Sequence, residues 1–514
     1  MSFQSMAFAA FLAAALLVFY AVPAKGRLLV LFLANLIFFE WTRPSAGIWL
    51  FLSVCTTWGA GLFLRKMKGR AGRRLLLIGC LAVNFGLLAV FKYLPVWDRL
   101  VNEALGGGLR RVHLDPAGAL GIAAPLGISF YTLQAAGYLL DVAKGRYEPE
   151  KNWLKYAVFV SFFPNILSGP IERGGHFLAQ LERVLAAGRR ELLCYDRIAQ
   201  GLTSMLLGYF MKLVVADRAA LLVDYLYGVY ENGNSFTMLM AALFYSVQIY
   251  CDFASYSLIA VGVGRLFGFE LLLNFCQPYL ANSLSDFWRR WHISLSSWLR
   301  DYVYIPLGGN RKGVWRKELN LVLVFLASGL WHGGAPHFLV WGLLWGLGIA
   351  VEDLAGRAFA GLQAVRAGRT GRTGRAVRGR RNPVFSAVIQ LVRVLGTFLA
   401  ATLLWIFFRS DSLEIAFVCF KNLFTGWLGF SYAEQFLFAM GLNRTEFWIA
   451  AGGMALLFIL DLVSEKKKQE TAVWIYRSPL PVRWGICLLL LGAVFAVGMY
   501  GQGFHASSFI YVNF

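Results

Sequence analysis

The sequence predicts an all-α protein that crosses a lipid bilayer many times. The chain of 514 residues is 58% apolar, its mean hydropathy is +0.58, and long apolar stretches recur from one end to the other. A soluble globular chain normally shows lower values and lacks such stretches. We therefore expect one helical membrane domain over residues 1–514, with a core at about 118–350 and further helices over 384–514.

The apolar stretches give the expected elements in order. Because about twenty apolar residues are needed to span a bilayer, we expect roughly eleven transmembrane helices, together with re-entrant or interfacial pieces that Gly and Pro interrupt. The first stretch follows a segment without positive charge and leads into further apolar helices, so we expect a span and not a signal peptide. The stretches are 6–22, 28–41, 48–64, 75–96, 117–142, 153–167, 202–215, 236–263, 319–331, 338–351, 384–408, 447–463 and 484–499.

The formal charge of +21 is concentrated in short loops at 65–74, 311–317, 366–381 and 466–468. The positive-inside rule predicts that these loops are cytoplasmic, where they also attract anionic lipids, and no nucleic-acid partner is expected. Both chain ends then fall on the external side. The segment at about 356–383 is expected to form a flexible basic cytoplasmic loop.

The absence of several known motifs argues against several classes of protein. The sequence has no Walker-type phosphate loop, no dinucleotide fingerprint after a strand and no His-Glu-x-x-His, which argues against an ATP-driven pump, a dehydrogenase and a zinc protease. Its seven Cys residues form no Cys-x-x-Cys pair, so we expect buried thiols and no metal centre. The sequence shows no clear repeat, which disfavours a transporter but leaves a transporter or channel as an alternative.

A run of ionisable and aromatic residues at 286–292 (Asp-Phe-Trp-Arg-Arg-Trp-His) interrupts the apolar background. Ionisable groups are costly in a bilayer and are retained mainly at sites that use them. Ser285 or Asp286 can cap a helix here, with Asp286 and Arg290 one turn apart, and we expect this helix to lie flat or dip into the membrane. Its apolar stripe comprises Phe287, Trp291 and Leu295. An interfacial anchor is the alternative for Trp288, Arg289 and Trp298.

Two His residues are candidates for chemistry. His332 ends an apolar stretch that starts at a cytoplasmic loop, and at 1.5 Å per residue it lies roughly 18 Å along the helix, within a hydrocarbon core about 30 Å thick. A His at that depth must pair, face a cavity or do chemistry, and a neutral imidazole in a partly wet cavity suits general-base work on an alcohol. His292 is expected to relay a proton or to orient His332. The residues alone therefore predict a site of acyl or proton transfer.

The turn at 306–313 (Pro-Leu-Gly-Gly-Asn-Arg-Lys-Gly) separates these two motifs. Its backbone amides, with Asn310 and Arg311 at the tip, could bind a phosphate. A tight cytoplasmic turn with orienting charges is the alternative.

A set of motifs spread over most of the chain resembles a known family. The motifs lie at 125–131, 162–173, 212–217, 274–279, 286–306, 307–311, 329–333 and 509–514. Together they resemble the membrane-bound O-acyltransferases (MBOAT), in particular their bacterial alginate O-acetyltransferase (AlgI-type) branch. The resemblance implies an MBOAT-type helical domain and O-acyltransferase activity.

The resemblance also implies roles for individual residues. His332 corresponds to the family's essential His, which implies a general base, and His292 to its second motif His, which implies support or substrate positioning. Acetyl-CoA is expected as the acyl-donor substrate, with no bound cofactor and no metal. The candidates for substrate binding are polar and aromatic residues of the same motifs: Asp286, Trp288, Arg289, Arg290, Trp291, Asp301, Tyr304, Asn310, Arg311 and Trp331.

A location and partners follow from the same resemblance. It implies a multi-pass protein of the bacterial inner (cytoplasmic) membrane that passes acetyl groups across the bilayer to an exported polysaccharide, such as alginate or cellulose, or to peptidoglycan. The expected partners are the lipid bilayer, a periplasmic or extracellular SGNH-type acetyltransferase and other polysaccharide-export proteins. A sister group moves D-alanine from a carrier protein to teichoic acid, and residues 168–171 (Ser-Gly-Pro-Ile) fit that group too. D-alanyl transfer is therefore the alternative, with a transporter or channel as the alternative of another class.

Overall fold

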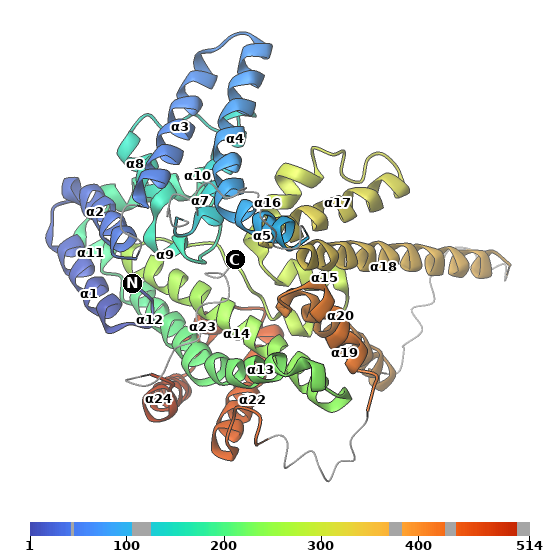
Figure 1. Ribbon diagram of the computed structural model, residues 1–514. Coiled ribbons are helices and arrows are strands. Elements are labelled where there is room, and N and C mark those ends of the chain that lie inside the picture. The colour runs from blue at the N-terminus through green and yellow to red at the C-terminus, as the bar shows by residue number, and fades with distance from the viewer. Residues whose placement is uncertain (43–45, 105–124, 370–382, 427–437, 501–514) are drawn as a thin grey trace.

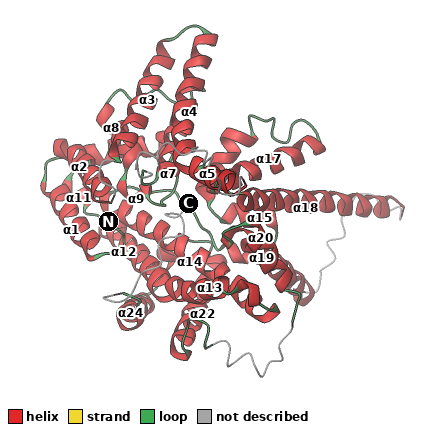
Figure 2. Cartoon of the chain, viewed as in Figure 1, coloured by secondary structure: helices red, strands yellow, loops and turns green. Residues whose placement is uncertain are grey.

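The computed structural model describes residues 1–42, 46–104, 125–369, 383–426 and 438–500. Every regular element among these residues is a helix (Figure 2), which confirms the predicted all-α class. The motif at 509–514, the start of the apolar stretch 117–142 and residues 370–382 of the basic loop lie outside the described residues.

The first five helices are α1 (Met6–Ala21), α2 (Ala24–Thr42), α3 (Gly47–Lys66), α4 (Arg70–Lys92) and α5 (Leu94–Ala104). α1 begins where the Ser5 hydroxyl accepts a hydrogen bond from the amide of Phe8 at 3.1 Å, which satisfies one of the amides that a helix start leaves without an internal partner. α3 and α4 form a hairpin that projects from the body of the molecule at the top of Figure 1. The far end of α4 returns to the centre of the molecule and contributes to the site described below.

The next helices are α7 (Ile128–Ala143), α8 (Trp153–Ser161), α9 (Phe163–Ile166), α10 (Gly174–Ala186) and α11 (Arg189–Leu192). The apolar stretch 153–167 does not form one span, because the chain leaves the helical conformation at Phe162 (φ −53°, ψ 109°). Pro164 then stands in the first turn of α9, where its missing amide hydrogen costs nothing.

The middle of the chain runs through α12 (Tyr195–Phe210), the π-helix η1 (Met211–Ala216), α13 (Asp217–Gly228), η2 (Tyr230–Asn232), α14 (Ser235–Phe267) and η3 (Pro278–Leu280). α14 starts with a capping box between Asn234 and Thr237 and ends at Gly268, whose φ of 95° suits a residue without Cβ. The wider turn of η1 carries Lys212, whose ammonium lies 2.8 Å from the Asp217 carboxylate and 2.6 Å from that of Asp252. This fully buried ion cluster joins η1 to α14.

The remaining helices are α15 (Leu284–Arg290), α16 (Ile293–Leu299), the π-helix η4 (Arg300–Tyr304), α17 (Val314–His332), α18 (Pro336–Arg369), α19 (Pro383–Arg409), α20 (Leu413–Asn422), α22 (Arg444–Lys467), α23 (Thr471–Arg477) and α24 (Leu480–Val497). α18 extends far to the right in Figure 1. Because α18 continues to Arg369, the first part of the segment predicted as a flexible loop at 356–383 is helical.

Seven helices in the described part of the chain are long and apolar enough to cross a membrane: Gly47–Lys66, Arg70–Lys92, Ser235–Phe267, Pro336–Leu362, Val384–Arg409, Arg444–Lys467 and Leu480–Val497. Met6–Ala21 is a shorter apolar helix. The number is below the roughly eleven expected from hydropathy, since several apolar stretches fold as short or broken helices. The protein is a multi-pass membrane protein.

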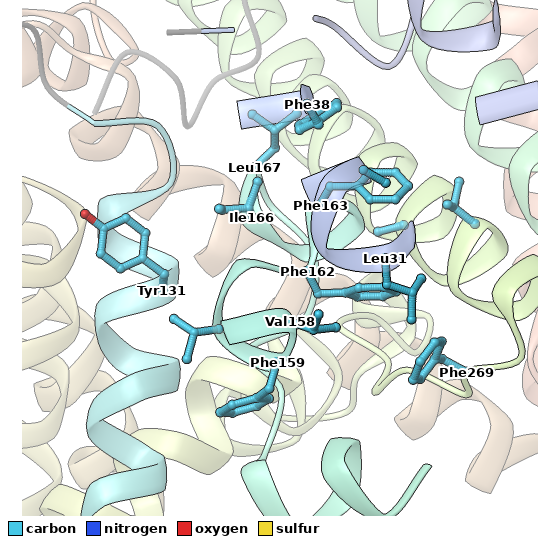
Figure 3. Packing of buried hydrophobic residues seen from close by; sticks show 14 of the residues in the cluster. Leu31, Phe38, Tyr131, Val158, Phe159, Phe162, Phe163, Ile166, Leu167 and Phe269 are labelled. Atoms are coloured by element: carbon cyan, nitrogen blue, oxygen red, sulfur yellow. The ribbon is translucent and has the colours of Figure 1, made fainter. Parts of the chain in front are cut away.

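Aromatic side chains make up much of the interior. In the cluster of Figure 3, Phe162 packs on Phe269 with ring centroids 5.1 Å apart, and Phe163 packs on Phe38 at 5.5 Å. These contacts join α2, the α8–α9 break and the segment after α14. The break in the predicted span at 153–167 is therefore packed as core.

The thiols only partly follow the prediction. Cys80, Cys251 and Cys419 are buried as expected, whereas Cys194 and Cys276 are exposed. Both exposed thiols lie outside the long apolar helices, in the loops before α12 and η3, so the prediction of buried thiols is wrong for them. All seven Cys residues are free thiols.

Candidate active site

His332 is the last residue of α17 and is buried. Two glycines let α17 and α18 approach closely here: a Cβ at Gly329 would lie 2.3 Å from the carbonyl oxygen of Phe338, and one at Gly342 would lie 2.3 Å from that of Phe325. Since real Cβ atoms do not come so near an oxygen, only Gly fits at either position. This contact fixes the end of α17, and the imidazole with it, against α18.

His292 lies at a break between α15 and α16. Its backbone adopts φ 44° and ψ 51°, a left-handed conformation that is rare outside Gly. Two backbone hydrogen bonds hold the break, one from the amide of Ile293 to the carbonyl oxygen of Asn274 at 3.0 Å and one from the amide of Cys276 to that of Arg290 at 2.9 Å. The prediction of one helix that carries Phe287, Trp291 and Leu295 on a single stripe is therefore wrong, because the helix is interrupted at Trp291 and His292. The break turns His292 inward, where it is fully buried.

The two imidazoles come together although they lie 40 residues apart in sequence. Their ring centroids are 6.4 Å apart, close enough for both to act on one small group between them. Aromatic rings enclose the pair: Phe253 lies 4.7 Å from His292, and Trp341 and Phe408 lie 5.2 and 5.0 Å from His332. The enclosure keeps bulk water away, which strengthens electrostatic interactions at the pair.

Trp331 and Lys92 complete the surroundings of the two imidazoles. The Trp331 indole lies 4.9 Å from the His332 ring and 5.6 Å from the His292 ring. The ammonium of Lys92, at the end of α4, donates to the Ser129 hydroxyl at 3.2 Å and to the carbonyl oxygen of Trp331. Lys92 is a site residue that was not predicted from the sequence. A lone cation inside the apolar stretch 75–96 was the signal that could have found it.

A groove of about 380 Å³ leads toward the pair between α16, η4 and α17, and we name it the α16–α17 groove. Exposed Arg289 and Arg300, together with Tyr304, line its open side. On α17 it extends to Ser328, one helical turn before His332. The groove therefore joins an arginine-rich opening to the neighbourhood of the buried imidazoles.

Trp288 and Trp291 lie in the aromatic core. Trp288 packs 5.8 Å from Trp341 and also lines the groove, so it stands between the groove and the ring that contacts His332. Trp291 packs on Phe287 and Trp405 with centroids 5.4 and 5.0 Å away. The structure gives Trp291 a packing role in the segment that carries His292.

The predicted pair of Asp286 and Arg290 forms, with 3.0 Å between the carboxylate and the guanidinium. Arg290 also donates to Glu465 of α22 at 2.6 and 3.1 Å. Burial opposes the charged form, but the hydrogen bonds to Glu465 raise the pKa of Arg290 above its ordinary value. The helix cap is Ser283, whose hydroxyl accepts from the Asp286 amide at 3.0 Å, and not Ser285 or Asp286 as predicted.

Asp301, Asn310 and Arg311 do not contribute to the pocket around the imidazoles. Asp301 pairs with Arg173 at 3.0 Å, and Asn310 and Arg311 are exposed on the turn before α17. The Asn320 amide holds this turn through the carbonyl oxygen of Gly309 at 2.9 Å. Within the described ranges, no three His, Cys, Asp or Glu side chains gather in a way that could hold a metal ion.

Comparison with known proteins shows the family to which the chain is related. The profile of MBOAT, the membrane-bound O-acyltransferase family, matches residues 150–379. The probable alginate O-acetylase AlgI of Pseudomonas putida is 33% identical over 411 residues, which are 79% of this chain and 76% of the relative. The peptidoglycan O-acetyltransferase of Helicobacter pylori is 33% identical over 421 residues, or 76% and 73% of the two chains. The teichoic acid D-alanyltransferase of Bacillus subtilis is 28% identical over 225 residues, or 42% and 56%.

Proposed function

The chain belongs to the membrane-bound O-acyltransferase family, and from that premise we propose that it takes an acetyl group from cytoplasmic acetyl-CoA and passes it across the membrane for O-acetylation of an exported polysaccharide or of peptidoglycan. That it is a membrane O-acyltransferase follows from the family and its relatives. The observation that carries the finer proposal is the buried pair of His332 and His292, 6.4 Å apart and approached by an arginine-lined groove.

The groove suits the donor. The nucleotide end of acetyl-CoA carries phosphates, which Arg289 and Arg300 can bind through charge-assisted hydrogen bonds at the open side. The narrow pantetheine arm then lies along the largely apolar wall of α17 toward Ser328, and Trp288 closes its inner end. This arrangement leaves the phosphates near water and directs the thioester toward His332, so the phosphates of the donor do not have to enter the aromatic enclosure.

His332 acts as the general base. Its neutral imidazole accepts the proton of the acceptor hydroxyl as the hydroxyl oxygen forms a bond to the thioester carbonyl carbon. The carbon–sulfur bond of the resulting tetrahedral intermediate then breaks, and the thiolate of CoA leaves with the proton from the imidazolium. His292, whose ring centroid lies 6.4 Å from that of His332, positions the acceptor hydroxyl. Trp331, which contacts both rings, keeps their orientation.

The acceptor side involves a partner. In this proposal the acetyl group leaves toward the periplasm, where an SGNH-type acetyltransferase and other polysaccharide-export proteins complete the transfer, and the protein lies in the bacterial inner membrane. The support comes from relatives that act on alginate and on peptidoglycan, both of which lie outside the cytoplasm. The basic segments at 65–74 and 466–468 favour an orientation that keeps the donor side cytoplasmic.

The test follows labelled acetyl-CoA with the protein in nanodiscs and with a partner acetyltransferase or polymer co-supplied as acceptor. Wild type should cleave the thioester, His332→Ala should lose cleavage while eluting as a folded monodisperse species, and His337→Ala should retain it. His337 is a matched control because it is also buried and lies five residues away, yet its ring packs on Phe338 and not on the pair. Equal turnover by wild type and His332→Ala would contradict the assignment of the base.

D-alanyl transfer is the second candidate, and the similarity to the Bacillus subtilis enzyme favours it. In that case the donor is a carrier protein charged with D-alanine, and free acetyl-CoA is not cleaved. The same nanodiscs given a D-alanyl carrier thioester distinguish the two donors, since only one of them should turn over in a His332-dependent manner.

A further inference from the structure

A second cavity lies on the other side of the segment that carries His292. It measures about 560 Å³ and opens between α12, α14, α22 and the loop at 273–277. Phe275 lines it, and Phe253 stands between Phe275 and His292 with ring centroids 4.9 and 4.7 Å away. Two aromatic layers thus separate this cavity, which we name the α22 cavity, from the imidazole pair, and the mechanism above does not use it.

The α22 cavity is apolar over much of its wall, which also carries the Asp461 carboxyl that accepts from the Tyr250 hydroxyl at 3.1 Å, and it is charged at its rim. Leu258, Leu457 and Leu460 line the walls from α14 and α22, which are both candidate membrane spans. The rim includes Glu465 and Lys468, at the end of α22, where a spanning helix leaves the hydrocarbon. A cavity with an apolar interior and a charged rim at a helix end matches the shape and polarity of a membrane amphiphile.

Both signs of charge occur at the rim. Arg290 contributes a cation that is braced by Asp286 and Glu465, and exposed Lys468 contributes a second. Glu465 and Glu470 contribute carboxylates, of which Glu465 pairs with Arg290 at 2.6 Å and Glu470 with Arg265 at 2.7 Å, so cations and anions alternate around the opening. A headgroup with only negative charge would meet these carboxylates, whereas a headgroup with a phosphate and a primary ammonium finds an opposite charge for each group.

The backbone supplies an independent observation. Among the described residues, three that are not Gly adopt a positive φ: Gln277 at 42°, His292 at 44° and Lys468 at 52°. His292 belongs to the imidazole pair, and the other two both line the α22 cavity. Such conformations cost of order 1 kcal/mol or more and cluster at sites that bind ligands or do chemistry. Lys468 is the left-handed cap that ends α22, a common conformation at helix ends, so Gln277 is the residue whose backbone marks the α22 cavity as a built site.

We propose that the α22 cavity binds a zwitterionic aminophospholipid. The phosphate lies against Lys468 and Arg290, the ammonium lies against Glu465, and one acyl chain lies along the leucine wall. The bound lipid braces Arg290 and the loop at 273–277, which together hold the break at His292.

Native mass spectrometry after purification in mild detergent tests the proposal. Wild type should retain one phosphatidylethanolamine per chain, and in nanodiscs of mixed phosphatidylethanolamine and phosphatidylglycerol it should enrich the former. Lys468→Glu should lower occupancy about tenfold by removing a charge-assisted contact. Lys466→Glu is the matched control, because it makes the same charge change two residues away and does not line the cavity.

A thiol reporter gives a second readout that needs no variant. Cys276 lines the cavity and is exposed, whereas Cys194 is exposed elsewhere. Phosphatidylethanolamine should slow maleimide labelling of Cys276 several-fold and leave that of Cys194 unchanged. Absence of retained lipid, equal loss in both lysine variants, preference for phosphatidylglycerol, or labelling of Cys276 that ignores lipid would each overturn the proposal.

Discussion

Replacing Lys92 by Met tests whether Lys92 positions His332 for the reaction without being needed for the fold. The ammonium of Lys92 donates to Ser129 at 3.2 Å and to the Trp331 carbonyl, and it lies 5.3 Å from the centroid of the Trp331 ring. That carbonyl is one of the last of α17, and no amide of the same helix remains to satisfy it. Lys92 therefore holds the turn from which His332 projects.

The expected change in the stability of the fold follows from two opposing contributions. Hydrogen bonds from a charged donor contribute about 1.5–3 kcal/mol each, but withdrawing an ammonium from water costs several kcal/mol. Because these terms largely cancel for folding, Lys92→Met should change the thermal stability little. Release of the helix end should nevertheless shift the imidazole, and a misplacement of about 1 Å costs roughly 100-fold in rate.

The assay is thioester turnover in nanodiscs, with kcat and KM measured separately. We expect kcat to fall by about two orders of magnitude, with KM for the donor nearly unchanged. Arg73→Met is the control. Arg73 also lies on α4, and it donates to the last carbonyl of a neighbouring helix, that of Ala143, at 3.2 Å. This hydrogen bond involves neither α17 nor the segment that carries His292. A folded Lys92→Met protein with kcat within threefold of wild type would refute the positioning role.

Three further outcomes test other parts of the structure. Arg289→Ala should raise KM for acetyl-CoA about tenfold with kcat retained, as measured by initial rates, since Arg289 lines the open side of the groove. Gly342→Val should lower the melting temperature by forcing α17 and α18 apart, at a cost of about 1–3 kcal/mol, whereas Gly356→Val on the same helix should not, because nothing lies within 4 Å of a Cβ there. The hydrogen bond to Glu172 raises the pKa of His176 above its ordinary value. This contact therefore stabilises the fold at pH values below the ordinary pKa of His, and its contribution to stability is lost as the pH rises through the raised pKa. His176→Gln should therefore melt below wild type at about pH 5.5 and together with it at about pH 9.

The sequence predicted the parts of the structure that depend on local composition. Apolar stretches gave the helical membrane fold, and the burial cost of imidazoles singled out His332 and His292. Their proximity could not be derived, because it results from a close contact between α17 and α18 and from a backbone break that joins 274–276 to 290–293.

The misses have physical causes as well. The periodicity of Phe287, Trp291 and Leu295 fits one helix, and only two backbone hydrogen bonds from a preceding loop interrupt it at His292. Lys92 contacts Trp331 from 239 residues away, and nothing local to either residue indicates the partner. Hydropathy also overlooks breaks such as that at Phe162, which is one reason why the described part of the chain has fewer long spans than the apolar stretches suggested.

The structure makes α15 a partition between two cavities. Arg289 lines the α16–α17 groove and Arg290 lines the α22 cavity, since successive residues of a helix point about 100° apart. His292 follows at the end of this partition. His332 belongs to α17, whose end is held by the contact with α18 and by the hydrogen bond from Lys92 of α4. The 6.4 Å between the two rings is therefore set by the packing of α15 against α17 and not within either helix.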